Sequence, residues 1–178
     1  MNTLDAINRR SSTKSYVDTL PSESDINVII NAGLRAASGR NMQAPIIVAV
    51  TDKTIRDALS SANAEIMGAS GDPFYGAPAV LVVLARKTAH TYVYDGSLAL
   101  GNMMLAAEEL GLGSCWVHRA KEVFEKEEWR SWLKKIGIDE EVEGIGNLIL
   151  GNPNGNIPEP KETMPNRVYW VMRSEFIF

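Results

Sequence analysis

The stretch Ala79-Val80-Leu81-Val82-Val83-Leu84 decides the fold class, because it is apolar at every one of its positions. A strand with one solvated face alternates apolar and polar residues, whereas a continuous apolar run is typical of a strand covered on both faces. Shorter apolar runs at 46–50, 114–117 and 145–150 predict further strands. The chain is therefore expected to contain a buried strand near its middle, with other strands before and after it.

Apolar residues at helical spacing predict helices in the first half of the chain. Thr3 can cap a short helix near the N-terminus, and Ser22 with Asp25 forms a capping pair for a second helix. Asp52 can cap a third, short helix. The apolar stripe of the second helix is expected to be buried and comprises Ile26, Ile29, Ile30, Gly33, Leu34 and Ala37.

The second half of the chain carries two longer helical patterns. Residues 94–110 are small or apolar nearly all round, which indicates a central buried helix that ends at Gly111. Residues 122–136 are amphipathic and predict one helix that ends at Gly137. Helices and strands thus alternate along the chain, without an internal repeat or a low-complexity tract.

The last segment, residues 155–178, has an unusual composition. It begins with prolines and ends with the aromatic residues Tyr169, Trp170, Phe176 and Phe178. Burying one large apolar side chain is worth roughly 1.5–3 kcal/mol, so such a terminus is expected to cover a surface. That surface is either a second subunit or the chain's own sheet, to which the segment would add a strand.

Length and composition restrict the class of protein. A chain of 178 residues fits one domain, 1–178, that can bury a hydrophobic core unaided. The net charge of −4 gives no reason to expect a nucleic acid partner. The N-terminus lacks the apolar core of a signal peptide, and no apolar run approaches the roughly 18 residues of a membrane helix. The single cysteine, Cys115, excludes an internal disulfide and favours a reducing compartment, so we expect a cytoplasmic protein.

One short stretch has the chemistry of an anion site. Arg9-Arg10-Ser11-Ser12-Thr13-Lys14 places three cations and three hydroxyls within six residues. Arginine supplies a forked donor, lysine a point charge, and hydroxyls bind sugar or phosphate oxygens. The same residues also fit a solvated basic helix end, because cations are favoured near the negative end of a helix dipole.

Other familiar sites are not supported by the sequence. Gly111-Leu112-Gly113 follows a helix and opens a strand, which is the reverse of a dinucleotide-binding turn. The two histidines, His90 and His118, have no further ligand at metal-binding spacing. Cys115 lies in an apolar strand, and no Gly-x-Ser-x-Gly elbow is present. An enzyme of this kind needs a cofactor to supply its chemistry.

Five segments, taken in chain order, form one further pattern. They are Arg10-Ser11-Ser12-Thr13-Lys14-Ser15-Tyr16, residues 36–43, residues 76–78, residues 95–116, and residues 150–153 followed by Pro160-Lys161. In this order they resemble the FMN-dependent nitroreductase family, whose motifs include Arg-(Arg/His)-Ser-x-(Arg/Lys)-x-(Phe/Tyr) and Ala-Pro-Ser-x-x-Asn-x-Gln. The resemblance spans nearly the whole chain.

The resemblance implies an α+β fold: a mixed β-sheet flanked by helices in three layers, within an intertwined homodimer that binds FMN at its interface. In such a dimer the tail, 155–178, is exchanged with the partner subunit. The implied reaction takes a hydride from NADH or NADPH and reduces a small acceptor such as a nitroaromatic or a quinone. The alternatives are a non-catalytic FMN carrier or sensor, and a specialised flavin dehydrogenase or dehalogenase.

The resemblance also implies roles for single residues. Arg10 and Lys161 would hold the FMN phosphate, with Ser12 on the ribityl chain or phosphate and Lys14 at the pyrimidine end of the flavin. Thr163 stands where the family has a second cation, so Arg9 is expected to assist Arg10. The full set of expected cofactor-binding residues is Arg9, Arg10, Ser11, Ser12, Lys14, Ala37, Ser38, Gly39, Asn41, His118, Arg119 and Lys161.

Overall fold

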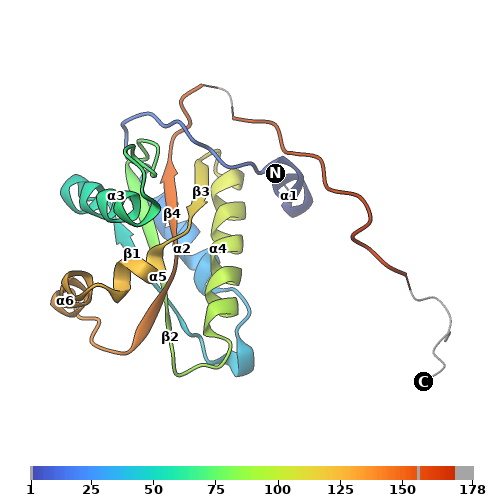
Figure 1. Cartoon of the computed structure of the whole chain (residues 1–178). Helices are drawn as coiled ribbons and strands as arrows, with labels where there is room; N and C mark the ends of the chain where they lie inside the picture. The colour runs from blue at the N-terminus through green and yellow to red at the C-terminus, as the bar shows by residue number, and fades with distance from the viewer. Residues whose placement is uncertain (1, 156, 171–178) are drawn as a thin grey trace, which may run out of the picture.

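The structure is a computed structural model that describes residues 2–155 and 157–170. Four strands form one sheet in the order β1-β2-β4-β3 (Figure 1). The strands are β1 (Pro45–Val50), β2 (Ala79–Arg86), β3 (Gly113–Val117) and β4 (Val142–Gly151). All three ladders are antiparallel. The α+β class is confirmed. The expected mixed sheet has parallel pairing, within the described residues, at an isolated bridge between Ser12 and Ser114.

Helices cover both faces of this sheet, which gives the expected three layers. In Figure 1, α2 and α4 lie on one face, and α3, α5 and α6 lie on the other. The short helix α1 packs beside α4. The bounds are α1 (Thr3–Arg9), α2 (Glu23–Leu34), η1 (Gly39–Asn41), α3 (Lys53–Met67), α4 (Tyr92–Glu109), α5 (Ala120–Glu125) and α6 (Glu127–Lys135).

The central strand β2 contributes to a hydrophobic core on each face of the sheet. Val80, Val82 and Leu84 join the core under α3, α5 and α6, whereas Leu81 and Val83 join the core under α2 and α4. All five side chains are completely buried. Since successive strand residues point to opposite faces, two cores require an apolar residue at every position. The continuous apolar run is thereby explained.

The three helix caps predicted in the first half of the chain contain one error. Ser22 caps α2 by accepting a hydrogen bond from the backbone N–H of Asp25, and Asp52 caps α3, as expected. The prediction for α1 was wrong by one residue, because Asn2 is its cap and forms a capping box with Asp5. Asparagine and threonine both accept such hydrogen bonds, and only the backbone conformation distinguishes the two positions.

The helix ends and faces needed more correction. The predicted short third helix continues to Met67, and it ends at Gly68 in the left-handed conformation. The predicted stripe of α2 is buried at Ile26, Ile29 and Gly33, but Leu34 is exposed and Ala37 lies beyond the helix. Leu34 is the last residue of α2 and Ala37 follows its end, so the helical periodicity does not predict burial past Gly33.

The predictions for the later helices were wrong in two respects. Residues 122–136 do not form one helix, because Lys126 is extended (φ −72°, ψ 139°) and separates α5 from α6. A single extended residue leaves the apolar spacing nearly unchanged, so the pattern could not reveal it. Helix α4 buries Gly96 and Leu100, but its outer face leaves Tyr94 71% and Leu98 51% exposed. None of the helices in the described part of the chain is long and apolar enough to cross a membrane.

Candidate functional site

A cavity of about 1150 Å³ lies where the segment after α1, the end of β3 and the C-terminal tail come together. Its volume is slightly above the range of roughly 300–1,000 Å³ that is typical of small-molecule and cofactor sites. Many of the predicted cofactor-binding residues line it, namely Arg10, Ser11, Ser12, Lys14, His118, Arg119 and Lys161.

Backbone hydrogen bonds hold the segment that follows α1 against the sheet. The N–H of Thr13 donates to the carbonyl of Ser114 in β3 at 3.0 Å, and the N–H of Val17 donates to Asn152 at 2.9 Å. The contact with β3 requires Gly113, because a Cβ there would lie 2.7 Å from Cγ2 of Thr13. Thr13 is buried while Ser12 and Lys14 are exposed, so the alternation of an extended chain turns these two toward the cavity side.

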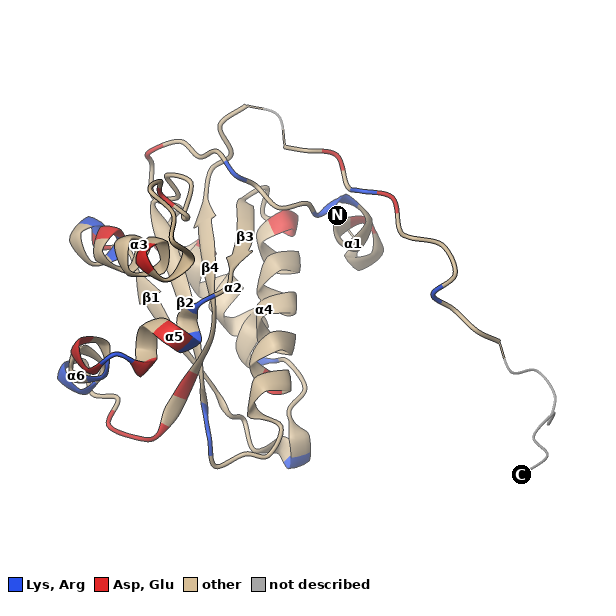
Figure 2. Ribbon diagram, viewed as in Figure 1, with Lys and Arg blue, Asp and Glu red and all other residues tan. Residues whose placement is uncertain are grey.

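The tail forms a second wall of the cavity. The hydroxyl of Ser11 donates a 2.5 Å hydrogen bond to the carbonyl of Pro158. This contact brings Lys161 to the same cavity as Arg10. Figure 2 shows basic residues on both the segment after α1 and the tail. Cavity-lining residues include four cations (Arg10, Lys14, Arg119 and Lys161) against two carboxylates (Glu159 and Glu162).

The third wall is the turn from β3 into α5, where Arg119 has an unusual backbone. Its φ of 89° is in the left-handed region, which costs a non-glycine residue about 1–3 kcal/mol. The Arg119 guanidinium donates to Oε1 of Glu122 at 2.8 Å. Burial opposes ionisation of Glu122, but hydrogen bonds from its own N–H and from Arg119 outweigh it and lower the pKa of this carboxyl. The pair joins the residue at the turn to the first turn of α5.

Sequence reasoning missed several cavity residues, of which Tyr75 is the most informative. Tyr75 is 40% exposed, and the Lys14 ammonium lies 5.5 Å from its ring centre, within cation–π range. Cys115 and Trp116 of β3 also line the cavity. No signal in the sequence distinguished Tyr75, because the neighbouring Phe74 is an aromatic residue of the same loop and is completely buried.

The remaining predicted residues lie elsewhere. Arg9 faces α4 and pairs with Glu108 at 3.7 Å. Ala37, Ser38, Gly39 and Asn41 belong to the loop around η1 and do not line this cavity.

The loop around η1 is fixed by the start of α4. The N–H of Gly39 donates to Oδ1 of the buried Asp95 at 3.1 Å, and the N–H of Gln43 donates to the Ser38 hydroxyl. A Cβ at position 39 would overlap the side chain of Thr91, so glycine is required for this close approach. The loop is therefore held in a defined shape at a distance from the chain's own cavity.

The donor set of the cavity suits a phosphate rather than a metal ion. Guanidinium, ammonium and hydroxyl groups donate hydrogen bonds to phosphate oxygens, and the two cationic groups repel metal ions. Within residues 2–155 and 157–170, no group of three or more His, Cys, Asp or Glu side chains could hold a metal ion. The aromatic Tyr75 and Trp116 add apolar wall area for a planar ring system.

Comparison with known sequences decides the family. Residues 7–148 match the model of the Nitroreductase family. A curated relative from Archaeoglobus fulgidus is 31% identical over 156 residues, which are 84% of each chain. The chain belongs to the nitroreductase family. That relative carries the provisional name NADH dehydrogenase/NAD(P)H nitroreductase.

Solved structures of the nitroreductase family have the same fold as this chain. A nitroreductase from Bacteroides fragilis with bound FMN has a TM-score of 0.85 at 25% identity and covers 96% of this chain and 99% of its own. A Desulfitobacterium hafniense nitroreductase with bound FMN has a TM-score of 0.84 at 24% identity, with the same coverage. An iodotyrosine deiodinase bound to FMN and 3-iodo-L-tyrosine shares the fold at a TM-score of 0.74 and 22% identity, covering 96% of this chain and 100% of its own.

Proposed function

We propose that this protein is an FMN-dependent oxidoreductase that takes a hydride from NADH or NADPH and reduces a small acceptor such as a nitroaromatic or a quinone. The observation that carries the proposal is the meeting of Arg10, from the N-terminal segment, and Lys161, from the tail, in one cavity. Membership of the nitroreductase family and the FMN in the B. fragilis structure support it.

The residues of the cavity fit FMN. In this proposal Arg10 and Lys161 bind the phosphate, and Ser11 and Ser12 donate to the phosphate or the ribityl hydroxyls. A charge-assisted hydrogen bond of this kind contributes about 1.5–3 kcal/mol. When bound, FMN supplies the two-electron chemistry that the side chains lack. Lys14 faces the pyrimidine end of the ring, where a cation stabilises negative charge.

We further propose that the site is completed by a second copy of the chain. The loop with Ala37, Ser38, Gly39 and Asn41 is assigned to the partner's flavin, which is consistent with its distance from the chain's own cavity. Helices α1 and α4 leave apolar side chains exposed, including Leu4 at 69% and Leu98 at 51%. The tail leaves Tyr169 and Trp170 more than four-fifths exposed, at 86% and 82%. A homodimer would cover these surfaces.

The experiment that tests the proposal is anaerobic addition of NADH or NADPH to purified protein that has been loaded with FMN. Rapid loss of the yellow colour, followed by its return when a quinone or nitroaromatic is added, is the expected result. Bound FMN that keeps its colour would point instead to a carrier or sensor. Protein that does not quench the fluorescence of added FMN would overturn the proposal.

A further inference from the structure

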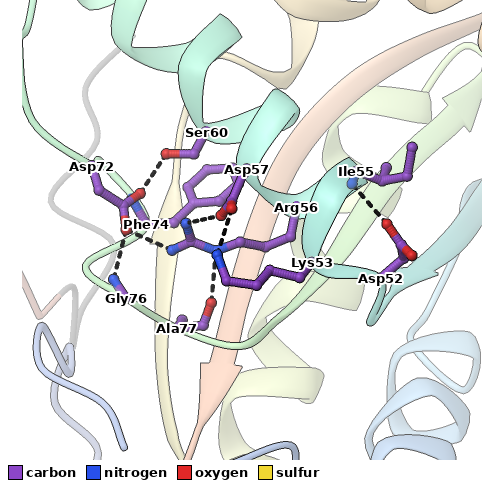
Figure 3. A network of polar contacts seen from close by, with 10 residues as sticks. All are labelled: Asp52, Lys53, Ile55, Arg56, Asp57, Ser60, Asp72, Phe74, Gly76 and Ala77. Carbon is purple, nitrogen blue, oxygen red and sulfur yellow. Dashed lines mark hydrogen bonds and ion pairs between the residues drawn. The ribbon is translucent and has the colours of Figure 1, made fainter. Parts of the chain in front are cut away.

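An ion-pair network stands behind the wall of the cavity that carries Tyr75. Arg56 of α3 is buried, and its Nη2 lies 2.6 Å from Oδ2 of Asp72 (Figure 3). Its Nε donates to the carbonyl of Ala77 at 2.8 Å. The guanidinium also lies 5.4 Å from the ring centre of Phe74, which is completely buried. One arginine therefore holds both ends of the loop from Asp72 to Ala77.

Asp72 fixes the shape of this loop through its backbone. Its Oδ1 accepts from the N–H of Phe74 at 2.9 Å, and its Oδ2 accepts from the N–H of Gly76 at 2.7 Å. The hydroxyl of Ser60 donates to Oδ1 as well. Burial acts against the charge of Asp72, but the hydrogen bonds from Arg56, Ser60, Gly76 and Phe74 lower the pKa of this carboxyl to about 2. The carboxylate is thus ionised and fully engaged at neutral pH.

The residue that this loop presents is Tyr75. It lies between the buried Phe74 and Gly76, and its φ of 52° is left-handed, which is unfavourable for an aromatic residue. Tyr75 is 40% exposed and lines the cavity wall. Its unfavourable backbone conformation must be maintained by contacts with the surrounding residues. The hydrogen bonds of Asp72 flank it on both sides and supply the constraint.

We propose that Tyr75 is a specificity-determining residue that stacks on aromatic electron acceptors, and that the Arg56–Asp72 ion pair is its positioning device. The inference rests on the proposed function, because it names the acceptor class of the same cavity. Aromatic rings prefer offset or edge-to-face partners, and a ring fixed in advance loses little conformational entropy when a planar acceptor binds. Lys14, 5.5 Å from the ring centre, limits where that ring can move.

The test compares an aromatic acceptor, nitrobenzene, with ferricyanide, an acceptor that has no ring. In FMN-loaded enzyme, Tyr75→Ala should raise KM for nitrobenzene about two- to tenfold, the range expected for loss of one aromatic pair. KM for ferricyanide should change much less, and Tyr75→Phe should recover most of the lost affinity. Equal changes for the two acceptors in Tyr75→Ala, or no change for either, would overturn the inference.

Two acidic partners of Arg56 provide a matched pair for the positioning role. Asp72→Asn weakens the loop and should raise KM for nitrobenzene in the same direction as Tyr75→Ala. Asp57 forms a different ion pair with Arg56, in which its Oδ1 lies 3.0 Å from Nη1, and it does not contact the loop. Asp57→Asn should therefore leave the KM for nitrobenzene unchanged. Equal effects of the two variants would overturn the positioning role. If Asp72→Asn does not fold, Ser60→Ala removes one hydrogen bond to the same carboxylate and should act in the same direction.

FMN content and loss of colour with NADH are measured on every variant. Wild-type protein without flavin would overturn the proposed function itself. Wild-type protein that retains FMN and turns over, with Tyr75→Ala showing no acceptor selectivity, would overturn the inference about Tyr75 alone.

Discussion

Ser11 and Pro158 are joined by a hydrogen bond of 2.5 Å, although 147 positions separate them in the chain. This contact brings the tail to the segment after α1 and so places Lys161 in the cavity that Arg10 lines. Each segment alone presents a few solvated cations. Together they form a site with a surplus of positive charge, which is the electrostatic requirement for holding a phosphate.

The first prediction concerns phosphate binding. Arg10→Ala should weaken FMN binding about ten- to hundredfold, because it removes a charge-assisted hydrogen bond worth roughly 1.5–3 kcal/mol. Arg9→Ala is the matched control: Arg9 pairs with Glu108 and does not line the cavity, so its loss should leave FMN affinity unchanged. Titration of FMN fluorescence into apoprotein measures both. Equal losses in the two variants would contradict the assignment of the phosphate to Arg10.

Lys14 is expected to act on the electronics of the flavin more than on its affinity. A cation near the pyrimidine end stabilises the negative charge that develops on reduction. Lys14→Ala should therefore make the reduction potential of bound FMN more negative, with a smaller change in its dissociation constant. A reductive titration against a dye of known potential measures the shift. An unchanged potential together with lost binding would mean that Lys14 serves the phosphate instead.

Asp72 should contribute to stability in a pH-dependent way. Its pKa of about 2 lies below the ordinary value of 3.8, so its contribution is present above pH 4 and is lost as the pH falls toward 2. Since the side chain is 36% exposed, we expect Asp72→Asn to lower the free energy of unfolding by about 1–2 kcal/mol at pH 7. Urea unfolding at pH 7 and pH 3 should show this difference shrinking in acid. A difference that is constant with pH would rule out an electrostatic origin.

The tail should be needed for assembly. Truncation after Pro165 removes Tyr169 and Trp170, which are almost fully exposed in the protomer and are expected to cover the partner. We expect aggregation or loss of flavin, because the apolar surfaces of both subunits lose their cover. Light scattering and flavin absorbance of the truncated and full-length proteins measure the two effects. A full-length protein that is monomeric at micromolar concentration would contradict the homodimer.

The kinetics should follow a ping-pong scheme. The sequence has no dinucleotide-binding turn, and several of the residues predicted to bind the flavin line the same large cavity. Donor and acceptor are therefore expected to use this cavity in turn. Initial rates at several acceptor concentrations should give parallel lines in a double-reciprocal plot. Intersecting lines would show that donor and acceptor bind together, and the shared cavity would then be the wrong description.

The sequence predicted the strands better than the ends of the helices. The run Ala79 to Leu84 was recognisable because a doubly covered strand has no polar position, and that rule depends only on the strand itself. The division at Lys126 and the extension of α3 to Met67 were missed, since helix ends depend on packing and on single backbone angles.

For the site, the sequence determined the chemistry of the donors and the tertiary structure decided which of them meet. The cations and hydroxyls from Arg10 to Lys14 were evident as an anion-binding pattern, because residue type alone fixes charge and hydrogen-bonding capacity. The fold decided three further contacts. It turns Arg9 toward Glu108, joins Ser11 to Pro158, and lets Asp72 constrain the backbone at Tyr75. Such contacts depend on long-range geometry, and no local pattern in a single chain records which distant segments will lie side by side.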